Sequence, residues 1–141
     1  MSLKYVIILS LLFSISCSPI NNAASSGKSV DSSFSDNNTT FVITVSEGEY
    51  SIDGFQRKTL NLRRGYTYNF DAQDSSTNNH PLYLGKISTT TGYSDEYTNG
   101  VTNSRTTNQI LTFKVPDNSP TTLYYKCGLH KYMGGQIMIV N

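Results

Sequence analysis

The chain has 141 residues, with 11 Lys plus Arg, 10 Asp plus Glu, two cysteines, two histidines, ten tyrosines and no tryptophan. Nucleic-acid binding needs a basic face, so a near-neutral chain argues against nucleic acid as a partner. The length predicts one domain behind a short N-terminal segment, and the low charge and abundant tyrosine favour an all-β domain.

The first 17 residues are typical of an export signal. Lys4 precedes an apolar stretch at residues 5–15 that is too short to span a bilayer, and the small residue Ser16 precedes Cys17. This order resembles a bacterial lipoprotein signal, in which Cys17 is lipidated and becomes the mature N-terminus. We therefore expect an exported protein, in the periplasm or at the cell surface, anchored to a membrane by lipid. An ordinary secretory signal cut elsewhere and an uncleaved membrane anchor are the alternatives.

Residues 18–40 are rich in Ser, Asn, Thr and Ala and contain too few apolar residues to form a core. We expect a flexible polar tether that holds the next domain on the order of 25 Å from the membrane. From Phe41 the pattern changes, because Phe41, Ile43 and Val45 alternate with polar or smaller residues along one face of a strand. The folded domain is therefore predicted to span residues 41–141.

Eight short strands are predicted in this domain, and turn residues separate them. They are residues 41–45, 50–52, 59–62, 66–70, 82–84, 110–115, 122–126 and 136–140. This pattern predicts a β-sandwich without a helix of useful length. The polar stretch between Gly85 and Gln109 is predicted to be a long loop or a hairpin beside the functional site.

The loop before the last predicted strand combines three residue types that bind soft metals. Cys127, His130 and Met133 supply a thiol, an imidazole and a thioether at a spacing that lets one turn surround one ion. Gly134 and Gly135 follow, and they permit the positive φ angles needed to turn into the final strand. The spacing therefore predicts that this loop binds one metal ion.

His80 is the only other histidine of the chain, and Pro81 behind it favours an extended backbone. A blue copper site uses two imidazoles and one thiolate, with a weak axial methionine. The chain has this inventory and little beyond it. Zinc also binds two histidines and one cysteine, but methionine is a soft ligand that favours copper. Asn79 is expected to connect the His80 loop to the Cys127 loop through its side chain and so to fix the ligand geometry before metal binds.

These motifs resemble those of the cupredoxins, the type 1 blue copper proteins. The segments that carry the resemblance are His-Pro-Leu-x-Leu at residues 80–84, Tyr-Thr-x-Gly-Val at residues 97–101, and Tyr-Tyr-x-Cys-x2-His-x2-Met-Gly-Gly at residues 124–135. The Cys-x2-His-x2-Met spacing is that of the amicyanin ligand loop. The resemblance covers residues 41–141 and implies a Greek-key β-sandwich of about eight strands.

The resemblance also implies the ligand roles and the function. It makes His80, Cys127 and His130 the equatorial ligands and Met133 the axial ligand of one copper ion. The implied function is that of a monomeric one-electron carrier, which cycles between Cu(II) and Cu(I) and serves redox partner proteins that the sequence does not identify. We expect no enzymatic activity, because oxygen reduction needs further copper centres that two histidines cannot supply.

The surface around His130 and the alternatives to an electron carrier also follow from the sequence. Leu82, Leu129 and Tyr132 are expected to form an apolar surface around the exposed edge of His130. The alternatives to an electron carrier are a copper storage or delivery protein at the cell surface, and a non-redox surface module built on a cupredoxin scaffold.

Overall fold

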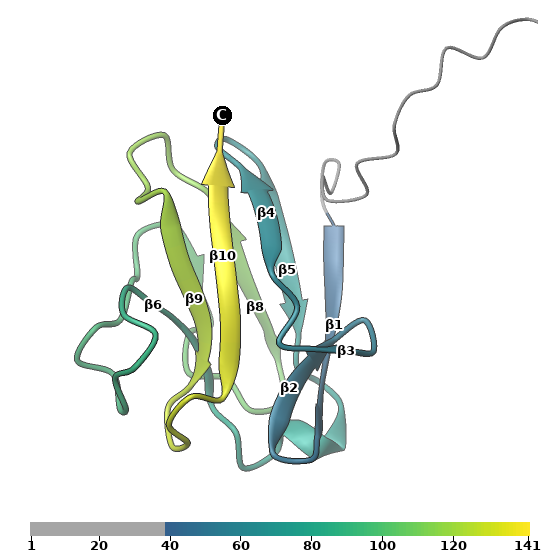
Figure 1. Cartoon of the computed structure of the whole chain (residues 1–141). Coiled ribbons are helices and arrows are strands. Elements are labelled where there is room, and N and C mark those ends of the chain that lie inside the picture. Colours follow the sequence, from purple (N-terminus) through teal and green to yellow (C-terminus); the bar gives the residue numbers. More distant parts are fainter. Residues whose placement is uncertain (1–38) are drawn as a thin grey trace, which may run out of the picture. The chain divides into compact units, whose positions relative to one another are not determined.

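The structure is a computed structural model that describes residues 39–141, and these form two β-sheets that share one core (Figure 1). The six-stranded sheet has the order β3-β2-β1-β5-β8-β7 and the four-stranded sheet the order β4-β10-β9-β6. The strands of the first sheet are β1 (Thr39–Ser46), β2 (Glu49–Ile52), β3 (Phe55–Gln56), β5 (Thr67–Asp71), β7 (Val101–Thr102) and β8 (Ile110–Lys114). Those of the second sheet are β4 (Leu60–Arg63), β6 (Leu82–Gly85), β9 (Thr122–Cys127) and β10 (Gly134–Val140). A short 3-10 helix, η1 (Ser75–Thr77), precedes β6.

Alternation of apolar and polar residues directs one face of each sheet into the core. Tyr68 and Phe70 of β5 are fully buried, whereas their neighbours in the strand are partly exposed. Leu111 and Phe113 of β8 repeat the pattern and pair with Phe70 and Tyr68 across the antiparallel ladder. Burial of each such side chain contributes about 1.5–3 kcal/mol, so these strands are held mainly by their inward faces.

The predicted all-β sandwich is confirmed. The chain passes from one sheet to the other five times, between β3 and β4, β4 and β5, β5 and β6, β6 and β7, and β8 and β9, as expected for a Greek-key arrangement. The structure adds β3 and β7 to the predicted strands, because a two-residue strand is too short to show a period of two.

The start of the described chain differs slightly from the prediction. Strand β1 begins at Thr39, two residues before the predicted start of the domain at Phe41. The predicted signal at residues 1–17 with its Cys17, and all but the last two residues of the predicted tether at 18–40, lie outside the described residues. Within residues 39–141, no helix has the length and the hydrophobicity needed to cross a membrane.

The four-stranded sheet brings the candidate ligands together. Strand β9 ends at Cys127 and β10 begins at Gly134, so the predicted ligand loop connects two antiparallel neighbours. Strand β6 lies on the other side of β9, with Leu82 directly opposite Cys127. Because His80 precedes Leu82 by two residues, the register places it at the end of β9 where the ligand loop starts.

The polar stretch between Gly85 and Gln109 is a loop that contains the short strand β7 and follows the free edge of β6. The Tyr97 amide donates to the Leu84 carbonyl at 2.8 Å, and the Leu82 amide donates to the Thr106 carbonyl at 2.7 Å. These bonds supply partners for β6, which is the edge strand of its sheet.

Candidate metal centre

Two imidazoles and one thiol converge at one end of the four-stranded sheet. The Cys127 Sγ atom lies 3.4 Å from His130 Nδ1 and 3.9 Å from His80 Nδ1. The ligand atoms of the three residues all lie within 4.8 Å of one another. No other group of three His, Cys, Asp or Glu side chains in the described part of the chain is arranged to hold a metal ion. The three side chains therefore form the candidate metal centre.

The donor spacing fits three ligands of a single ion. Imidazole nitrogen binds a metal such as zinc at about 2.0 Å and thiolate sulfur at about 2.3 Å, so a nitrogen and a sulfur in a trigonal plane are separated by about 3.7 Å. The two measured sulfur-to-nitrogen distances, 3.4 and 3.9 Å, lie on either side of this value. The residues therefore fit a mononuclear site with both histidines turning Nδ1 toward the sulfur.

His80 is fixed through both polar groups of its backbone. Its amide donates to the carbonyl of Thr77, at the end of η1, at 2.8 Å, and its carbonyl accepts a hydrogen bond from the Tyr50 hydroxyl at 2.6 Å. Burial and the neighbouring His130 lower the pKa of the His80 imidazole. A lowered pKa favours the neutral ring, which is the form that binds a metal.

The ligand loop is closed by a backbone hydrogen bond from the Cys127 amide to the Met133 carbonyl, 3.1 Å long. Gly134 has a φ of +143°, and a Cβ atom there would collide with the backbone of β9, so the predicted glycine turn is needed at this position. Tyr132 also has a positive φ, +67°, although it is not a glycine. This left-handed conformation costs roughly 1–2 kcal/mol, which the rest of the loop must offset.

Met133 and His130 differ in their exposure to solvent. Met133 is 2% exposed and belongs to the same buried core as Cys127, whereas His130 is exposed. The axial role of Met133 stays a prediction. Leu129 and Tyr132, which flank His130 in the sequence, are 65% and 53% exposed, and the apolar surface expected from them stays a prediction. The expectation that Leu82 joins this surface is wrong, because β6 directs that side chain into the core, where it is fully buried.

Backbone groups join the His80 loop to the Cys127 loop. The Gly128 amide donates to the Pro81 carbonyl at 2.9 Å, next to the paired residues Leu82 and Cys127. Asn79 is exposed, and the connection expected from its side chain stays a prediction.

Comparison with known proteins gives a likeness only at the level of solved structures. No family model matches the sequence, and no curated protein matches it. Similar structures include rusticyanin from Thiobacillus ferrooxidans, with 14% identity, a TM-score of 0.48 and coverage of 76% of this chain and 80% of that one. Reduced rusticyanin gives 15% identity, a TM-score of 0.48 and coverage of 76% and 82%. A variant of the multicopper oxidase McoA from Aquifex aeolicus gives 16% identity and a TM-score of 0.40, and the chain spans 28% of that protein.

Identities this low do not assign a ligand or an activity, so the assignment depends on the residues of this chain. Two imidazoles and a cysteine sulfur meet at the end of an all-β sandwich, and a buried methionine follows in the next loop. In fold and in ligand set, the chain resembles a cupredoxin. The end of β9 and the loop after it supply two of the three converging side chains, Cys127 and His130, and the segment before β6 supplies the third, His80.

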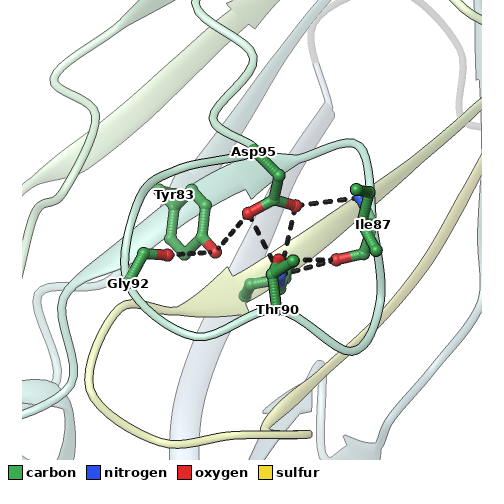
Figure 2. A network of polar contacts seen from close by, with 6 residues as sticks. Tyr83, Ile87, Thr90, Gly92 and Asp95 are labelled. Atoms are coloured by element: carbon green, nitrogen blue, oxygen red, sulfur yellow. Dashed lines mark hydrogen bonds and ion pairs between the residues drawn. The ribbon is translucent and has the colours of Figure 1, made fainter.

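A buried ion pair lies beside the cupredoxin-like site, where the loop after β6 covers the four-stranded sheet. Lys126 Nζ is 3.2 Å from Asp95 Oδ2 and donates to the Ile87 carbonyl at 2.6 Å. Figure 2 shows Tyr83, Ile87 and Thr90 arranged around the Asp95 carboxylate. Burial would raise the pKa of Asp95, but hydrogen bonds from these three residues and from Lys126 outweigh it and lower the pKa to about 2.

The same loop also contacts the ligand loop of the cupredoxin-like domain. The Gly92 amide donates to the Gly128 carbonyl at 3.2 Å, and the Tyr93 ring packs so closely against Gly128 that no Cβ atom would fit. The Arg105 guanidinium lies 4.1 Å from the centre of the Tyr93 ring. Sequence reasoning missed these contacts and the buried Lys126. The one available signal was a lysine within the otherwise uncharged run that leads to the ligand cysteine.

Proposed function

We propose that this chain is a mononuclear type 1 blue copper protein that carries single electrons at the cell envelope. The observation that carries the proposal is the convergence of His80, Cys127 and His130, whose ligand atoms lie within 4.8 Å of one another. Two imidazoles, one thiolate and a weak axial methionine are the donor set of blue copper electron-transfer sites. His80, Cys127 and His130 would hold the copper ion with Met133 as a weak fourth donor, and the ion would supply the Cu(II)/Cu(I) couple.

The residues of the chain hold the donors in place for this role. Cys127 is fixed by its pairing in β9 and is only 1% exposed, so its sulfur is shielded from water. His80 is fixed by the hydrogen bonds to both of its backbone polar groups. Donors that keep their positions in both oxidation states keep the reorganisation on electron transfer small. The exposed His130, beside Leu129 and Tyr132, offers the side on which a partner comes closest to the site.

The cellular location and the partners in this proposal follow from the sequence. The signal-like residues 1–17 support export, Cys17 supports a lipid anchor, and the polar residues 18–40 support a tether between the membrane and the domain. Redox partner proteins would deliver and accept the electron at the periplasmic or cell-surface face of that membrane. The protein would act as a monomer.

The proposal includes no transformation of a substrate. Both histidines of the chain belong to the one candidate site, so none is left for the additional copper centres that oxygen reduction requires. Reversible exchange of one electron is the chemistry that this inventory supports.

Adding Cu(II) to the purified full-length protein tests the proposal directly. We expect an intense visible band from thiolate-to-Cu(II) charge transfer, a matching electron paramagnetic resonance signal, and reversible one-electron cycling. Cys127→Ser should abolish the band because it removes the thiolate. Cys17→Ser is the matched control and should keep the band, because the other cysteine is outside the proposed site.

Other results of this experiment would replace the proposal. A colourless protein that takes up only Cu(I) would indicate copper storage or delivery. Selective uptake of Zn(II) would indicate a zinc site with the same three donors. A metal-free protein that is equally stable and functional at the cell surface would indicate a non-redox module.

A further inference from the structure

One tyrosine of the other sheet reaches the candidate metal centre. Tyr50 lies in β2, in the six-stranded sheet, and is fully buried. Its hydroxyl donates a hydrogen bond of 2.6 Å to the carbonyl of His80, which leads into β6 of the four-stranded sheet. The Tyr50 and His80 rings also meet edge to face, with centroids 6.4 Å apart. Tyr50 therefore contacts His80 through both its hydroxyl and its ring.

Burial and the neighbouring Cys127 raise the pKa of Tyr50 far above its ordinary range, so the hydroxyl keeps its proton. A phenol has one proton to donate, and the distance of 2.6 Å assigns it to the His80 carbonyl. Tyr50 therefore acts on the site through the backbone of His80.

We infer that Tyr50 is a positioning residue of the metal centre, which holds His80 in register with Cys127 through the hydrogen bond to the His80 carbonyl. The inference rests on the proposed function, because it concerns the copper affinity and the potential of that site. The hydroxyl has this effect because it connects the six-stranded sheet to His80, a candidate ligand that lies outside regular secondary structure. The His80 amide bonds locally to Thr77, so the bond from Tyr50 is the one that relates His80 to the other sheet.

Tyr125 provides a matched comparison inside the same core. Its ring is also fully buried and lies 6.4 Å from the Tyr50 ring, and its hydroxyl also donates to a backbone carbonyl, that of Lys58, at 2.9 Å. The carbonyl of Lys58 belongs to the chain before β4 and not to a ligand. Removing either hydroxyl removes one hydrogen bond to a backbone carbonyl. Only the Tyr50 hydroxyl is bonded to a candidate metal ligand, His80.

The test compares Tyr50→Phe with Tyr125→Phe in the full-length protein. Cu(I) affinity is measured by competition with a chromophoric chelator, and the reduction potential by spectroelectrochemistry. We expect Tyr50→Phe to weaken Cu(I) binding about tenfold, the usual scale for groups that orient a metal ligand. Its potential should also shift, because a displaced His80 imidazole changes the donor set of the two oxidation states unequally. Tyr125→Phe should leave both quantities at their wild-type values.

Equal values for Tyr50→Phe and wild type, or equal changes in Tyr50→Phe and Tyr125→Phe, overturn the inference. If Tyr50→Phe does not fold, 3,5-difluorotyrosine at position 50 keeps the ring and strengthens the donor to the His80 carbonyl. The Cu(I) affinity should then rise, and an unchanged affinity overturns the inference instead.

The outcomes also separate this inference from the proposed function. A wild-type protein that binds Cu(I) or Co(II) but gives no blue Cu(II) form contradicts the proposed function. In that case the affinities of Tyr50→Phe and Tyr125→Phe for the bound metal still decide the role of Tyr50. A wild-type protein that binds no metal overturns both.

Discussion

Met133 is the residue through which the potential of the proposed site can be changed most directly. Met133→Leu removes the axial sulfur, which stabilises Cu(II), and keeps a similar buried volume, so the potential should rise. We expect a rise on the order of 60 mV or more, which corresponds to a tenfold change in relative affinity for a one-electron couple. Spectroelectrochemical titration measures it. Met138→Leu is the control, because Met138 is 38% exposed on β10 and should leave the potential unchanged. A potential that stays constant in Met133→Leu would show that Met133 is not a ligand.

At the residue scale, a site can be predicted from the sequence when its residue types are rare. Two histidines and two cysteines leave few combinations, so His80, Cys127 and His130 could be singled out without coordinates. Tyr50 could not, because it is one of ten tyrosines and only the tertiary fold distinguishes it. Lys126 could not either, because lysine is almost never fully buried and its partner is 31 residues away.

The loop between β6 and β7 stabilises β9 through the buried pair of Lys126 and Asp95, whose side chains are 5% and 2% exposed. Lys126→Met removes one partner and leaves the Asp95 charge buried, which should cost about 3–5 kcal/mol. Lys58→Met is the matched control, because Lys58 and Asp53 form an ion pair at the surface, where such pairs contribute less than about 1 kcal/mol. Urea unfolding of the copper-free proteins measures both. Similar losses in the two variants would show that the buried pair does not stabilise the loop.

The same element makes stability depend on pH in acid. Folding lowers the pKa of Asp95 from its ordinary value of 3.8 to about 2. A lowered carboxyl pKa contributes stability that is fully present above the unfolded-state value and is lost as the pH falls through the folded-state value. Wild-type protein should therefore lose on the order of 2 kcal/mol between pH 5 and pH 2 through this group. Asp95→Asn should give a flatter curve in urea unfolding across this window, and identical slopes would contradict the assignment.

At the scale of elements, prediction succeeded where a strand buries one complete face. Strands β5 and β8 were predicted because Tyr68, Phe70, Leu111 and Phe113 alternate with less buried residues. Strands β3 and β7 have two residues each and leave no such pattern. The loop after β6 was predicted only as a loop or a hairpin, because its order comes from contacts such as Asp95 with Lys126 and not from its own hydrophobic pattern.

At the scale of the whole domain, the metal centre lies at one end of a core that does not depend on it. The core contains more than twenty buried residues from both sheets, and of the four candidate ligands only Cys127 and Met133 belong to it. Small metal domains unfold without their ion because metal binding supplies most of their folding energy. Here the two sheets bury a core of their own, so the copper-free protein should remain folded.

Copper should therefore increase the free energy of unfolding of a protein that is already folded without it. The size of the increase depends on the ratio of the copper concentration to its Kd. A ligand that binds only the folded state at 1,000 times its Kd contributes about 4 kcal/mol. For a domain of about 100 residues, 1 kcal/mol changes Tm by about 4–8 °C, so saturating copper should raise Tm by roughly 15 °C or more.

Thermal unfolding followed by circular dichroism, with Cu(I) added under anaerobic conditions, measures this rise. Cys127→Ser should stay folded and show a much smaller rise, because it lacks the thiolate that connects the ion to β9. A copper-free wild-type protein without a cooperative transition would contradict the independence of the core. An equal rise in both proteins would contradict the site.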